Sequence, residues 1–81
     1  MKHTPVVVVW RDIFDEGPEW IHPGADPIVP VVVRTAAYLL CKNADFVVVA
    51  RDYYDHEGAR VYGGRMAIPY GCIDSITGID L

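Results

Sequence analysis

Carboxylates gather in one stretch of the chain, and carboxylate oxygens are ligands that Ca²⁺ and Mg²⁺ prefer. The acidic residues in and just before this stretch are Asp12, Asp15, Glu16, Glu19 and Asp26. A calcium-binding loop needs acids at alternating positions, a glycine and a terminal glutamate, and this spacing does not supply them. We therefore interpret the stretch as a solvated acidic surface and predict no metal ion and no other cofactor.

Histidine and cysteine are the other metal-ligating residues, and they are scattered. His3, His22 and His56 lie far from each other and from both cysteines, whereas zinc usually takes four Cys or His ligands at close spacings. Cys41 and Cys72 are too few for a disulfide scaffold. We expect two free thiols, buried or half-buried, in a reducing cytosol.

Nucleophilic catalysis needs a Cys or Ser beside a base and an oxyanion donor. The nearest approach is Cys72 followed by Asp74 and Ser75, which does not form such a set. Gly63 and Gly64 fall inside a predicted strand, where they indicate a bulge or a close backbone approach rather than a phosphate-binding loop. The sequence therefore predicts a protein that is not an enzyme.

Composition places the chain among small globular proteins. Its 81 residues, 52% hydrophobic and 22% charged, predict one domain over residues 1–81. The net charge of −4, from 7 Lys and Arg against 11 Asp and Glu, argues against DNA binding because phosphate-binding surfaces carry a surplus of cations. The apolar runs are too short to span a membrane, so we expect a cytoplasmic protein without membrane contact.

Valine, isoleucine and tyrosine dominate the chain, and no window has a helical apolar period, so the fold class is all-β. Five strands are expected, over about residues 6–13, 28–41, 45–54, 60–68 and 72–79. Short polar turns at 42–45 and 55–58 join the three middle strands into a meander. A tight corner at 69–71 precedes the last strand.

The valine runs Val6–Trp10, Val31–Val33 and Val47–Val49 do not alternate with polar residues. A strand with one wet face should alternate, so both faces of these strands are expected to be covered. A chain of this size has little spare length for a second layer. We expect the outward valines to be covered by the long loop or by another subunit, and the runs therefore predict self-association.

The strands are interrupted by a long loop at about 15–30, which is rich in proline and acids and has no Lys or Arg. Trp20 and Ile21 lie in its middle, and we expect them to anchor it across the sheet. Trp10 and Trp20 support two interpretations. They either pin the loop to the first strand or form an aromatic groove that binds a protein partner.

The end of the chain resembles the Sm-like sequence signature, in which an apolar residue, a basic residue and a glycine precede spaced aliphatic residues. The apolar, glycine and aliphatic places are taken by Ile68, Gly71, Ile73 and Ile76, and the basic one by Tyr70. The segments 35–40 and 46–49 are similar to the first half of the signature. The Trp10-Arg11-Asp12 start, the Trp20-Ile21 pair and the corner at 68–71 are similar to small Sm-like proteins of phages from marine and environmental sources.

This resemblance covers about residues 31–79, and it implies that the chain as a whole is a five-stranded, strongly bent antiparallel SH3-type barrel. It also implies a homo-oligomeric ring of about five to seven copies, joined through the edges of the fourth and fifth strands. In Sm-like rings the turn between strands two and three and the corner before strand five bind RNA at the pore. The positions carried over are Lys42 and Asn43 in the turn, and Tyr70 and Gly71 in the corner.

The expected function is a non-enzymatic ring that binds single-stranded RNA weakly, since Tyr70 replaces the basic residue. Two alternatives remain open. One is an SH3-type protein-interaction module that uses Trp10 and Trp20. The other is a phage accessory or structural protein that binds no RNA.

Overall fold

The computed structural model describes residues 3–13, 17–18, 20 and 22–79. Five strands follow one another: β1 (Pro5–Asp12), β2 (Val31–Lys42), β3 (Phe46–His56), β4 (Ala59–Pro69) and β5 (Ile73–Gly78). A single 3₁₀ turn, η1 (Tyr70–Cys72), joins β4 to β5, and the described residues contain no α-helix. The all-β class and the meander are confirmed, and each strand lies within three residues of its expected bounds.

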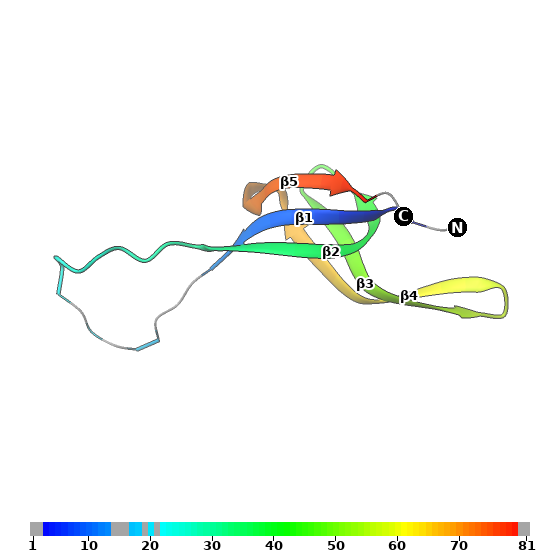
Figure 1. Cartoon of the computed structure of the whole chain (residues 1–81), viewed down its shortest axis with the longest axis horizontal. Helices are drawn as coiled ribbons and strands as arrows, with labels where there is room; N and C mark the ends of the chain where they lie inside the picture. Colours follow the sequence, from blue (N-terminus) through cyan, green and yellow to red (C-terminus); the bar gives the residue numbers. More distant parts are fainter. Residues whose placement is uncertain (1–2, 14–16, 19, 21, 80–81) are drawn as a thin grey trace.

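The strands form one antiparallel sheet in the order β4-β3-β2-β1-β5. Strand β2 divides its hydrogen bonds between two neighbours, because residues 31–38 pair with β1 and residues 38–42 pair with β3. Figure 1 shows the result, a sheet bent along β2 and β3. Its two edges, β4 and β5, are not paired with each other, so closure into a barrel stays a prediction.

One face of the bent sheet makes the core. Buried side chains come from four strands and are Val6, Val8, Ala37, Val47, Val49 and Ile68. Partly buried side chains surround them, chiefly Trp10, Leu39, Met66, Cys72, Ile73 and Ile76. In β1 to β4 these residues lie two apart along the strand, as the pleat requires, whereas Ile73 and Ile76 of β5 are three apart, beside a register shift in the pairing of β1 with β5.

The opposite face of the sheet is only partly covered. In β1 the buried Val6 and Val8 alternate with half-buried Val7 and Val9. In β2, Val31 and Val32 are 43% and 50% exposed. The expectation that both faces are covered therefore holds for part of β1 and fails for the start of β2 within a single chain.

Beyond the bend, β3 and β4 continue as a two-stranded hairpin that leaves the sheet (Figure 1). Its turn places Glu57 at φ 49° and Gly58 at φ 79°, the left-handed conformations of a type I′ turn, whose twist matches the flanking strands. Gly64, in β4, has φ 67° and would bring a Cβ to 3.3 Å from Asp52 Oδ2. A close approach therefore exists at Gly64, but it is to the side chains of Asp52 and Arg51 rather than to the backbone that the sequence predicted.

The described part of the loop between β1 and β2, residues 17–18, 20 and 22–30, does not fold back onto the sheet. Residues 26–30 continue the line of β2 past the end of the sheet, and a turn at 22–25 precedes them (Figure 1). Trp20 is 99% exposed, so the expected anchoring by Trp20 is wrong; Ile21 lies outside the described residues. The physical reason is that Asp12 and Val31 pair to the very end of β1, and Pro27 and Pro30 then hold the chain extended.

Stability should depend on the few buried valines. Val49→Ala removes two methyl groups from a fully buried site and should lower the free energy of unfolding by roughly 2 kcal/mol. Val32→Ala, at a half-exposed site, should change it by no more than about 0.5 kcal/mol. Urea unfolding at one fixed protein concentration measures both, and equal effects would contradict this placement of the core.

Candidate functional site

The turn between β2 and β3 is built by Asn43. Its side-chain Oδ1 accepts hydrogen bonds from the backbone N–H groups of Asp45 (2.8 Å) and Phe46 (2.9 Å). Its own N–H donates to the Phe46 carbonyl oxygen at 3.1 Å. An Asn side chain that satisfies backbone donors in this way replaces part of the ladder at the turn. Its amide NH₂ is then the group left to contact a ligand.

The corner before β5 lies against this turn. The Tyr70 N–H donates to the Asp45 carbonyl oxygen at 3.2 Å, and Phe46 pairs with Pro69 in the sheet register. Pro69 has φ −61°, which directs the chain from β4 into the 3₁₀ turn. The turn and the corner, which the resemblance assigns to the same pore, therefore lie side by side in one chain, and Tyr70 is 40% exposed beside them.

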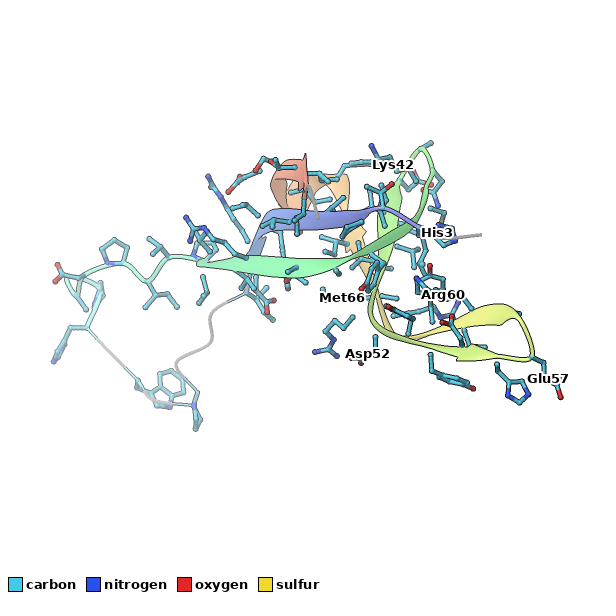
Figure 2. All side chains as sticks on the ribbon, turned by 45° about the vertical axis from the view of Figure 1, so that its right-hand side comes forward. His3, Lys42, Asp52, Glu57, Arg60 and Met66 are labelled. Atoms are coloured by element: carbon cyan, nitrogen blue, oxygen red, sulfur yellow. The ribbon has the colours of Figure 1, made fainter. Side chains whose placement is uncertain are left out.

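We call Lys42, Asn43, Tyr70 and Gly71 the turn cluster. It combines a phenol ring, an amide and an ammonium group at one end of the sheet, where Figure 2 shows Lys42. Lys42 has no ion pair among the described residues, while Asp45 nearby is exposed and lowers the local positive charge. A ring, an amide donor and a cation suit a nucleobase and its phosphate, since stacking on an aromatic ring contributes about 1–3 kcal/mol per base.

The two tryptophans do not form a joint groove. Trp10 lies in β1, packs against the core and donates from its indole Nε1 to Thr35 Oγ1 at 2.9 Å. Trp20 is almost fully exposed and so contacts almost nothing. Trp10 instead lines a cavity of about 190 Å³ together with Met66, Ile68 and Cys72.

The potential metal ligands are not brought together. Among residues 3–13, 17–18, 20 and 22–79, no three His, Cys, Asp or Glu side chains converge. Asp12 Oδ1 accepts the Ile13 N–H at 2.8 Å, a local contact, and Asp26 lies in the extended loop. The other acids considered, Asp15, Glu16 and Glu19, lie outside the described residues.

Both cysteines are free thiols. Cys72 is half-buried, as expected. Cys41 is exposed, which corrects the expectation for that residue. The reason is a register shift between Leu39 and Cys41, which moves Cys41 out of the regular alternation near the end of β2.

An aromatic cluster at the base of the hairpin was not foreseen. The rings of Tyr38, Tyr53 and Tyr62 lie 5.3–6.3 Å apart, and His3 packs edge-on against Tyr62 at 5.1 Å. A signal for part of it was present, because Tyr53 and Tyr62 are equidistant from the turn at Glu57–Gly58 and therefore pair across the strands. The contacts of Tyr38 and His3 depend on the bend of the sheet, which no local pattern reveals.

Arg60 ties this cluster to the hairpin. Its Cζ lies 3.6 Å from the Tyr53 ring centroid, and its Nε donates to Asp55 Oδ1 at 3.0 Å. The hydrogen bond from Asp55 raises the pKa of Arg60 above its ordinary value, so the group stays charged. Figure 2 shows Arg60 and His3 near the base of the hairpin and Glu57 at its tip.

No family model, curated protein or solved structure matches the chain. Among the described residues, no helix has the length and apolar character needed to cross a membrane.

The turn cluster gives a stability prediction that separates Asn43 from its neighbour. Asn43→Ala removes the acceptor for two backbone donors and should lower the free energy of unfolding by about 1 kcal/mol. Lys42→Ala, at an exposed position, should change it by less than about 0.5 kcal/mol. Urea unfolding at fixed protein concentration checks the pair, and an unchanged Asn43→Ala midpoint would contradict the structural role.

Proposed function

We propose that this chain is a non-enzymatic, Sm-like protein that assembles edge to edge into a homo-oligomeric ring and presents its turn cluster to single-stranded RNA. The observation that carries the proposal is the open sheet, whose edge strands β4 and β5 are each paired on one side within the chain. An unpaired edge strand binds another strand readily. Two different edges that bind each other give a head-to-tail contact, which closes into a ring when the rotation permits.

The outer edge of β5 has backbone groups free to pair. Ile79 donates its N–H to the Pro5 carbonyl oxygen at 3.0 Å, so at this position the backbone faces β1. Hydrogen-bonded and non-hydrogen-bonded positions alternate in an antiparallel ladder. The N–H of Gly78, one residue earlier, therefore points away from β1 and toward the edge where a neighbouring β4 would bind.

The RNA part of the proposal rests on the turn cluster. Tyr70 supplies a partly exposed ring, Asn43 an amide NH₂ and Lys42 a cation, and the contact between Tyr70 and Asp45 holds the two segments together. A ring of copies repeats this set around its axis, and repeated weak contacts to one strand add up. With a net charge of −4 and one lysine in the set, each contact is weak and depends little on salt.

The ring is tested by native mass spectrometry at low micromolar concentration. The expected mass is that of about five to seven copies. Gly78→Pro removes an outward donor from β5 while leaving its pairing with β1, so it should shift the population to smaller species without unfolding the chain. Thr77→Pro is the control, because its N–H faces β1 and its loss should destabilise the fold itself. A monomer in the unsubstituted protein would overturn the ring.

RNA binding is tested by fluorescence anisotropy with a labelled single strand of about ten nucleotides, at increasing salt. Tyr70→Ala should weaken binding by about 5- to 100-fold for each stacked base that is lost, and the substitution is present in every copy of the ring. Lys42→Ala should lower the slope of log affinity against log salt by about 0.7 for each copy that contacts the strand. Tyr54→Ala is the matched control, because Tyr54 is 62% exposed on the distant hairpin and should leave binding unchanged. No binding at low salt would overturn the RNA part and leave the ring standing.

A further inference from the structure

An apolar segment precedes β2 and is exposed to water. Pro27, Ile28, Val29 and Pro30, here called the proline segment, are in neither helix nor strand, and they continue the line of β2 beyond the sheet (Figure 1). Ile28 is 46% exposed and Val29 is 70% exposed. Two prolines three residues apart favour an extended polyproline conformation, which loses little entropy when it binds.

An apolar groove lies elsewhere on the same chain. It has a volume of about 190 Å³ and lies between the end of β1 with the residue after it (Trp10, Arg11, Asp12 and Ile13) and Met66–Pro69 of β4 with Cys72 of η1. Since β1 and β4 are not neighbours in the sheet, the groove lies where the open sheet fails to meet itself. Aromatic-lined grooves of this kind bind extended proline-containing segments. Trp10 Nε1 already donates to Thr35, so the ring contributes apolar surface.

The proline segment of the same chain does not fill this groove. Val31 pairs with Asp12 and Val32 with Arg11, so the segment leaves β2 beyond the end of β1 and runs away from Trp10. To reach the groove it would have to reverse direction at once and break these pairs. We therefore consider the proline segment of a second copy as the segment that fills the groove.

We propose that the proline segment of one copy docks in the Trp10–Met66–Pro69 groove of its neighbour. The proposal rests on the proposed self-association. In an antiparallel contact, the end of one β4 at Pro69 lies opposite the start of the neighbour's β5 at Ile73. Ile73 pairs with Trp10 in its own chain, near the end of β1 from which the proline segment leaves. The edge contact thus brings the segment of one copy to the groove of the next.

Charge supports the same docking. Asp26 is exposed and immediately precedes the proline segment. Arg11 borders the groove with 61% of its side chain exposed, and its Nε holds Asp74 at 3.3 Å. Its terminal nitrogens have no partner among the described residues, so they are available to a carboxylate from the second copy.

Cysteine cross-linking tests the docking, because Cys72 already lines the groove. The protein carries Cys41→Ser to remove the other thiol and Val29→Cys to place one in the proline segment, and it is oxidised with diamide. A ladder of covalently linked copies on non-reducing electrophoresis is the expected result. The matched control is Val61→Cys in the same background, an exposed valine on the hairpin, which should cross-link at least about tenfold more slowly.

Each other outcome overturns the proposal in a distinct way. A disulfide within one chain, seen as a monomer that migrates faster, would mean that the segment docks in its own groove. Cross-linking no faster than the control would mean that the groove is not its site. The native mass of the same variant under reducing conditions separates these failures from failure of the ring, because a monomer there would overturn the self-association itself.

A second measurement does not require oxidation. In a Trp20→Phe background, acrylamide quenching of the remaining tryptophan reports how exposed Trp10 is. Val29→Asp should increase this quenching at least about twofold, because a carboxylate will not enter an apolar groove. Val29 is 70% exposed, so Val29→Asp should leave the chain folded, and circular dichroism checks that unfolding is not the cause of any increase in quenching. Unchanged quenching would overturn the docking.

Discussion

The fold depends on the way β2 shares its backbone hydrogen bonds. The first part of this 12-residue strand pairs with β1 and the last part pairs with β3, and only residue 38 pairs with both. The sheet must therefore bend at this point, and the bend turns one face inward around Val8, Val47 and Val49. The same division leaves β3 free to run past β2 with only β4 as its partner. Core, groove and hairpin all follow from this division.

Much of this architecture could be predicted from local patterns. Clusters of valine and isoleucine located the five strands, because branched side chains fit a pleated, half-buried surface. Polar residues around Asn43 and Gly58 located the turns. An Asn side chain can accept hydrogen bonds from the turn backbone, and a Gly can adopt a positive φ. The order of strands in the sheet and the separation of its two edges could not be derived in this way, because they depend on contacts between distant residues.

The candidate site shows the same limit. Tyr70 and Asn43 were singled out by resemblance, and the structure adds the contact through Asp45 that places their segments side by side. Trp20 shows why an apolar residue in a loop is a poor guide to burial. Burial of a tryptophan side chain is favourable. Burial still requires that the backbone can bring the side chain into contact with the rest of the protein. In this chain β1 and β2 stay paired as far as Asp12 and Val31, so residues 26–30 run away from the sheet.

The hairpin beyond residue 51 has a consequence for the dynamics of the molecule. Its strands have no third strand beside them, and every residue from 51 to 59 is exposed. Two-stranded ribbons are marginally stable alone, so the aromatic cluster and Arg60 supply much of what keeps this ribbon formed. The amide protons of the ribbon should therefore exchange with solvent through local opening, whereas those of Val47 and Val49 should exchange only when the whole sheet unfolds. We thus expect two cooperative units joined by continuous strands.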